Sequence, residues 1–166
     1  MLVNKTSLDL FSRVVTISIG LIVMLGLGMI FFSDRKTAGS LLAGVCMAIL
    51  CVCYFFSVES YVLDDDLLII KRPFGIFSKK IPLSDIQEIK ILGGNERTGL
   101  VRTFADGGVF GYWGWFYSRK LGKVYVLAKN MKNLTMVVLK SNGRKLILSP
   151  DENTLTVYIT EKLGKF

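Results

Sequence analysis

The chain has 166 residues, of which 51% are hydrophobic and 20% are charged, and its net charge is +8. The excess of apolar residues lies mostly in the first third of the chain, which excludes one evenly composed soluble domain and favours membrane segments followed by a small globular domain. There is no histidine, and the three cysteines lie in one apolar stretch. The composition therefore excludes a Ser–His or Cys–His catalytic pair and provides no disulfide framework.

Two uncharged apolar stretches, residues 14–32 and 38–58, follow an N-terminal tail of residues 1–13. Each is close to the ~20 residues that a helix needs to cross the hydrocarbon core of a bilayer. Neither alternates polar and apolar residues as a barrel strand does, so we expect helices. The short link at residues 33–37 then predicts a two-helix transmembrane hairpin. The first stretch is too long for a typical signal peptide and a second follows at once, which favours an uncleaved anchor.

Small residues recur every four positions in the second apolar stretch, at Ser40, Gly44 and Ala48. They share one helix face, and small residues at this spacing let two helices approach closely. We expect this face to pack within the hairpin. Association between copies of the chain is the alternative.

Positively charged residues lean toward the side of the membrane that the two termini share. Lys5 and Arg13 precede the first apolar stretch and further Lys and Arg residues follow the second, whereas the link carries Arg35 and Lys36. Because segments rich in Lys and Arg stay in the cytoplasm, we expect a multi-pass protein of the cytoplasmic membrane whose termini and globular part are cytoplasmic. That part is itself basic, which suits a leaflet rich in anionic lipid.

The globular part, residues 59–166, reads mainly as β-strands. Asp64–Asp66 is a turn signal, and Asn142-Gly143 between apolar runs predicts a hairpin. The expected strands are residues 59–63, 67–71, 76–81, 86–91, 123–129, 134–140 and 145–148. Strands at this spacing, with turns between them, are typical of a barrel or a sandwich.

The end of the chain changes to a helix pattern. The run Ser149–Glu152 has a capping serine, a proline in the first helical position and a glutamate three residues after the cap. Leu155, Ile159 and Leu163 then lie four residues apart and share one face. We expect a helix whose apolar face covers an open barrel end.

These features resemble those of the bacterial pleckstrin-homology-like (PH-like) domain family. The resemblance rests on the β-rich run closed by one capped helix, on FGYWGWFYSRKLGKVYVLAKN at residues 110–130 and on LSPDEN at residues 148–153, and it covers roughly residues 59–163. Members of this family often follow two membrane helices. The resemblance implies a β-rich, PH-like, partly open barrel with one C-terminal helix after the membrane α-helical hairpin. It implies no catalytic activity and transfers no lipid-binding residues.

The first candidate site is a predicted hairpin with a basic pair on each side of an apolar tip. Such a tip can enter the headgroup layer while the cations meet anionic lipid. In the alternative, the apolar side chains pack inward and the charges are solvated. The residues proposed for lipid contact are Lys71, Arg72, Phe74, Ile76, Phe77, Lys79 and Lys80.

The second candidate is the glycine- and aromatic-rich stretch at residues 107–123. It lacks the strand–GxxxxGK[ST]–helix pattern of a phosphate loop, and single-stranded nucleic acid is not the expected partner of a membrane-tethered domain. The functional interpretations are a membrane-facing aromatic belt and a partner surface, whereas a contribution to the core is the interpretation that we favour. The residues proposed for a partner surface are Tyr112, Trp113, Trp115, Arg119 and Lys120.

Asp64–Asp66 lacks the further spaced oxygen ligands of a calcium loop, so we expect a solvated turn, no metal site and no cofactor. We expect a non-catalytic binding or scaffolding module at the bacterial inner membrane, with membrane lipids, a protein partner or copies of itself as partners. A small oligomeric two-helix pore or transporter-associated subunit is the alternative. The spans lack the interior ionisable residues that commonly mark transport paths.

Overall fold

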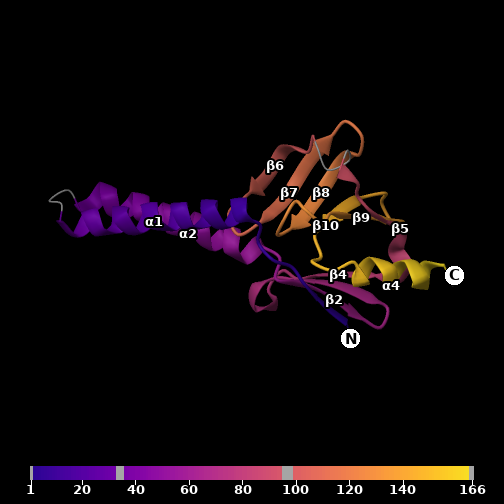
Figure 1. Cartoon of the computed structure of the whole chain (residues 1–166). Helices are drawn as coiled ribbons and strands as arrows, with labels where there is room; N and C mark the ends of the chain where they lie inside the picture. Colours follow the sequence, from indigo (N-terminus) through magenta and orange to yellow (C-terminus); the bar gives the residue numbers. More distant parts are fainter. Residues whose placement is uncertain (1, 33–35, 95–98, 165–166) are drawn as a thin grey trace.

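The computed structural model describes residues 2–32, 36–94 and 99–164. Two long helices, α1 (Leu10–Phe32) and α2 (Lys36–Phe56), lie side by side and project from one end of a β-rich domain (Figure 1). Asp9 caps α1, because its Oδ1 accepts a hydrogen bond from the Ser12 backbone N–H at 2.8 Å. The expected helical hairpin is therefore present, although α1 begins four residues before the uncharged stretch.

The contact between the two helices does not use Gly44 or Ala48 of α2. Gly44 and Ala48 are exposed on the outward face of α2, and no atom lies within 4 Å of the place where a Cβ on Gly44 would stand. The less exposed positions in the middle of α2 are Ala43, Cys46, Leu50 and Cys53, which recur at helical spacing. The expected packing of Gly44 and Ala48 within the hairpin is therefore not observed, and the side chain of Ser40 lies outside the described residues.

The first sheet has four antiparallel strands in the order β1-β2-β3-β4. Three of them, β2 (Ser60–Asp64), β3 (Leu67–Lys71) and β4 (Lys79–Pro82), follow α2 in the chain. The fourth, β1 (Leu2–Lys5), lies in the stretch that we expected to be a tail, and it pairs Leu2 with Leu63. The chain therefore enters and leaves the helical hairpin from neighbouring strands.

The second sheet has six strands in the order β5-β9-β10-β8-β7-β6. Strand β10 lies between β8 and β9, antiparallel to β9 and parallel to β8. The Asn142-Gly143 hairpin between β9 and β10 is thus present, but β8 and β9 are not neighbours. The strand bounds are β5 (Ile86–Ile91), β6 (Val101–Gly107), β7 (Tyr112–Ser118), β8 (Gly122–Ala128), β9 (Thr135–Leu139) and β10 (Lys145–Leu148).

The described strands form two separate sheets, and no barrel closure is seen, so the expected partly open barrel is corrected to a two-sheet arrangement. The 3-10 turn η2 (Leu83–Asp85) carries the chain from β4 to β5. Asp85 then fixes β5 beside β9, because its carboxylate accepts hydrogen bonds from Ser141 N–H and Oγ at 2.8 and 2.9 Å. At the outer edge of the first sheet, Pro82 has no N–H to extend the pairing.

The main hydrophobic core lies between the two sheets, and α4 (Thr154–Leu163) contributes to it. Leu155 and Ile159 of α4 are fully buried among side chains of both sheets. Each such side chain contributes ~1.5–3 kcal/mol to stability through burial. The C-terminal helix is therefore present with the expected face, but its N-cap is Asn153 and not Ser149.

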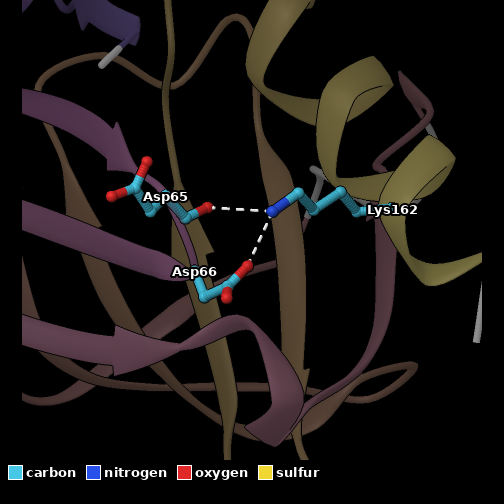
Figure 2. A network of polar contacts seen from close by, with 3 residues as sticks. All are labelled: Asp65, Asp66 and Lys162. Atoms are coloured by element: carbon cyan, nitrogen blue, oxygen red, sulfur yellow. Dashed lines mark hydrogen bonds and ion pairs between the residues drawn. The ribbon is translucent and has the colours of Figure 1, made fainter.

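Lys162, in the last turn of α4, joins this helix to the turn between β2 and β3. Its Nζ lies 2.6 Å from Asp66 Oδ1 and donates a hydrogen bond to the Asp65 carbonyl at 3.1 Å (Figure 2). Asp65 has φ 46°, in the left-handed region that Asp and Asn adopt in turns. The acidic cluster thus lies in a turn and pairs with a lysine of α4.

Candidate functional site

The connection between β3 and β4 presents three apolar side chains to solvent. Phe74, Ile76 and Phe77 are 77%, 46% and 61% exposed, so they do not pack inward. Phe74 and Phe77 have φ of 59° and 58°, a conformation that is costly for bulky residues. The backbone of this tip therefore holds large aromatic groups outward at an energetic cost.

The tip lies against the end of α2, where an aromatic cluster joins the helix to the domain. Phe56 stacks on Phe77 at 5.3 Å between ring centroids and on Trp113 of β7 at 4.8 Å. Tyr54 makes edge contacts with Phe74 at 6.4 Å and with Phe110 at 5.3 Å. These contacts hold the exposed tip at the level where α2 leaves the helical hairpin.

The pleat of the first sheet separates the four basic residues of the predicted hairpin into two pairs. Lys71 and Lys80 lie on its outer face, because strand residues alternate between faces and Ile70 points into the core. Arg72 and Lys79 lie on the inner face, at positions in phase with Ile70. The sequence pattern predicts one basic surface, whereas the structure places these cations on two faces.

The inner pair has unusual surroundings for cations. Arg72 is 7% exposed, its guanidinium Cζ lies 5.1 Å from the Phe56 ring centroid, and its Nε is buried without a hydrogen-bond partner among the described residues. Burial lowers the pKa of Lys79, and the positive charges of Arg144 and Arg72 lower it further. Lys79 thus faces two other cations.

Arg144 reaches this region from the second sheet. It precedes β10 and is in phase with Leu146, a core residue, so it belongs to the face that looks toward the first sheet. Its Cζ lies 5.3 Å from the ring centroid of Trp115, and Lys123 Nζ lies 4.5 Å from the same centroid. Neither Arg144 nor Lys123 is among the site residues predicted from the sequence, although their spacing from core residues of β10 and β8 is a signal that points to them.

The five residues proposed for a partner surface do not form one surface. Tyr112 is buried in the second core cluster, on one face of β7. Trp113 and Trp115 lie on the opposite face, toward the first sheet. Arg119 and Lys120 are exposed in the turn between β7 and β8.

A buried polar network, which the sequence analysis did not find, ties the N-terminal segment to the domain. The Tyr61 hydroxyl donates to the Leu127 carbonyl at 2.6 Å and accepts from the Ser149 backbone N–H at 3.0 Å. Thr6 Oγ1 donates to the Ser149 carbonyl at 2.6 Å, and Ser149 Oγ accepts from the Lys129 N–H at 2.8 Å. Ser149 is therefore a connector of segments and not a helix cap. Burial raises the pKa of Tyr61 to about 12.

At the surface, Asp151 also attaches the N-terminal segment to the domain. Its Oδ1 accepts hydrogen bonds from the backbone N–H and Oγ of Ser7 at 3.0 and 2.9 Å, and its own N–H donates to the Lys5 carbonyl at 3.1 Å. Asn130 Nδ2 donates to the Ser7 carbonyl at 3.2 Å. The segment between β1 and α1 is thus bound to the domain along its length.

The first turns of α1 also contact the domain directly. Tyr112 donates to Asp9 Oδ2 at 3.0 Å, so the residue that caps α1 also bonds to β7. Thr16 Oγ1 accepts from the Phe110 N–H at 3.0 Å and lies 3.4 Å from the Gly108 carbonyl. Both helices therefore join the domain through side chains at their ends.

Leu10–Gly28 is the one described helical segment that is long and apolar enough to cross a membrane, and the apolar segment Leu41–Phe56 of α2 is shorter. Across residues 2–32, 36–94 and 99–164, no three His, Cys, Asp or Glu side chains are grouped to hold a metal ion. The distinctive groups of the candidate site are the exposed apolar tip and the inner pair of cations, Arg72 and Lys79.

Comparisons with known proteins agree with this architecture. The Bacterial PH domain (bPH_5) family profile matches residues 59–157, which is more than half of the chain. Searches of the curated proteins and of the solved structures found no match. The matched region begins directly before β2 and ends inside α4. With its two sheets, its C-terminal helix and this match, the chain belongs to the Bacterial PH domain family.

Proposed function

We propose that the chain is a non-catalytic, membrane-anchored binding module of the bacterial cytoplasmic membrane. In this proposal α1 and α2 both cross the bilayer, and the domain and both termini face the cytoplasm. The observation that carries the proposal is the exposed aromatic tip of Phe74, Ile76 and Phe77 beside the end of α2. Exposed apolar side chains such as Phe can insert at the boundary between the headgroups and the acyl chains, and the tip lies where that boundary would be.

Two charges on the outer face of the first sheet support the same placement. Lys71 and Lys80 flank the tip and make no ion pair with any described residue. Each cation near an anionic leaflet contributes ~1 kcal/mol to membrane attraction. The domain would therefore bind lipid headgroups through its tip while the helices keep it at the bilayer. Gly44 and Ala48, which face outward from α2, are available for association with a second copy.

Depth-dependent fluorescence quenching in proteoliposomes tests the placement of the tip. A background with Cys46, Cys51 and Cys53 replaced by alanine receives one cysteine, at Phe74→Cys or at Val157→Cys, and is labelled with an environment-sensitive dye. Val157 is exposed on α4, at the end of the domain away from the helices (Figure 1). The full chain is used because β1 belongs to the domain.

Spin-labelled lipids should quench the dye at position 74 several-fold more strongly than the dye at position 157. Equal quenching at the two positions, or none at either, would show that the tip does not contact lipid. Ion flux through the same proteoliposomes would favour the pore instead.

A further inference from the structure

The inner cations, Arg72, Lys79 and Arg144, are three positive side chains without an acidic partner. None of them forms an ion pair with a described residue. Lys79 is half-buried on the inner face of the first sheet, and both arginines act on it electrostatically. Like charges that lie close together destabilise the unliganded protein unless a bound anion neutralises them.

Arg72 supplies an independent indication of a ligand. Its side chain is more than nine-tenths buried, and the buried Nε–H has no acceptor in the described part of the chain. A buried donor without a partner costs free energy, and native proteins usually satisfy such groups with protein, water or a ligand. The cation–π contact of its guanidinium with Phe56 holds the group in place and provides no acceptor for the Nε–H.

Trp115 positions the cation that comes from the other sheet. Arg144 and Lys123 both lie over its ring, at 5.3 and 4.5 Å from the centroid. Cation–π contacts of this kind hold a guanidinium without neutralising it. The cluster is therefore preorganised from both sheets, which lowers the cost of binding an anion.

We propose that the inner cations bind a phosphate-type anion where the inner faces of the two sheets meet. Two planar guanidinium groups and one ammonium group match an anion that carries several oxygens and more than one charge. One source of the phosphate is a lipid headgroup beside the tip, and for this source the site rests on the proposed function. A soluble phosphate compound has the same chemistry.

A titration with inorganic phosphate, at constant ionic strength and in neutral detergent, tests the site on the full-length chain. Tryptophan fluorescence and calorimetry should show saturable binding. Lys79→Ala and Arg144→Ala should each weaken it by about tenfold or more, because each removes a charge-assisted hydrogen bond. Arg72→Lys, which keeps the charge but loses the planar fork of donors, should weaken it as well.

Lys80→Ala is the matched control, because it removes the same charge from the adjacent residue on the opposite face of β4. It should change the affinity by less than about twofold if the site is specific. Equal weakening by Lys80→Ala and Lys79→Ala would show general charge attraction and overturn the proposal. An absence of saturable binding to phosphate and to anionic lipid would also overturn it.

Nanodiscs of phosphatidylglycerol or of neutral lipid identify the source of the phosphate. If inorganic phosphate binds in nanodiscs of neutral lipid but not in nanodiscs of phosphatidylglycerol, a lipid headgroup occupies the site. Equal binding in both shows a soluble phosphate ligand, and either result supports the site. The detergent titration needs no bilayer, so failure of the anion site and failure of the lipid contact at the tip are seen separately.

Discussion

At the scale of single residues, Tyr61 joins distant segments of the domain through one hydroxyl group. The side chain is fully buried, and its oxygen bonds to the Leu127 carbonyl and to the Ser149 N–H. Tyr61→Phe should lower the free energy of unfolding by ~2–3 kcal/mol, because it leaves two buried backbone groups without partners. Denaturant unfolding of the full chain in detergent measures this loss. Tyr117→Phe, at a half-exposed tyrosine of β7, should have little effect, and an equal loss there would contradict the argument.

Asp106, at the domain end near the helices, makes stability depend on pH. Burial raises the pKa of this carboxyl, although backbone hydrogen bonds and Arg102 oppose the shift, and its Oδ2 has no described partner. The folded state therefore holds the proton more tightly than the unfolded state, whose pKa is ~3.9. The associated stability is complete below that value and is lost as pH rises through the folded-state pKa.

The free energy of unfolding should consequently fall less steeply with rising pH, from pH ~4 upward, in Asp106→Asn than in the original chain. Asp64→Asn, an exposed change at the end of β2, serves as the control. If Asp106→Asn left the slope unchanged, burial of this carboxylate would not be the cause.

At the scale of secondary-structure elements, one glycine sets the approach of β6 to β7. Gly114 has φ 116°, and a Cβ there would lie 2.6 Å from both Ala105 Cα and the Phe104 carbonyl oxygen. Gly114→Ala should therefore destabilise the domain by ~3 kcal/mol or more, through backbone strain and overlap with the paired strand. Gly143→Ala shares the positive φ but has open space, so thermal unfolding should show a smaller loss of ~1 kcal/mol.

One exposed carboxylate, that of Asp151, contributes to the attachment of the segment that follows β1. Asp151→Ala removes the acceptor for both Ser7 donors, so the amides of residues 2–7 should exchange with deuterium ~10-fold faster or more. The amides of β8–β10 should keep their protection. Glu152→Ala is the neighbouring control, and faster exchange in that variant would indicate a general charge effect.

The sequence predicts most of the strands because each is a short apolar run between turn signals. It does not predict that β10 lies between β8 and β9, because the parallel pairing of β10 with β8 joins strands that are not consecutive in the chain. Nor does it predict β1, whose contacts are remote: Asn4 and Thr154, which are joined by a hydrogen bond, are 150 positions apart. Patterns along the chain carry no information about such pairings.

The same limit applies to the candidate site. The basic and aromatic hairpin is visible in the sequence, and its exposed tip agrees with the membrane-contact interpretation. The division of Lys79 from Lys80 follows from strand alternation once the strand bounds are known. The approach of Arg144 to Lys79 depends on how the two sheets pack, which no local pattern specifies.

At the scale of the whole molecule, the pairing of β1 with β2 places both ends of the helical hairpin on one side. Tags fused to the N-terminus and after the C-terminus should therefore show the same protease sensitivity in membrane vesicles. Both should be cleaved only in vesicles whose cytoplasmic face is outward. Cleavage of one tag in each vesicle orientation would mean that one helix does not cross the bilayer.

The edge position of β1 has a consequence for how the protein is made. Leu2–Lys5 leave the ribosome before either helix, while their partner strand, Ser60–Asp64, is synthesised only after both. The first sheet is therefore completed only after both helices have been synthesised. Because the domain is held by a strand at each end of the hairpin, it cannot swivel about one linker, and its exposed tip keeps a fixed direction relative to the helices.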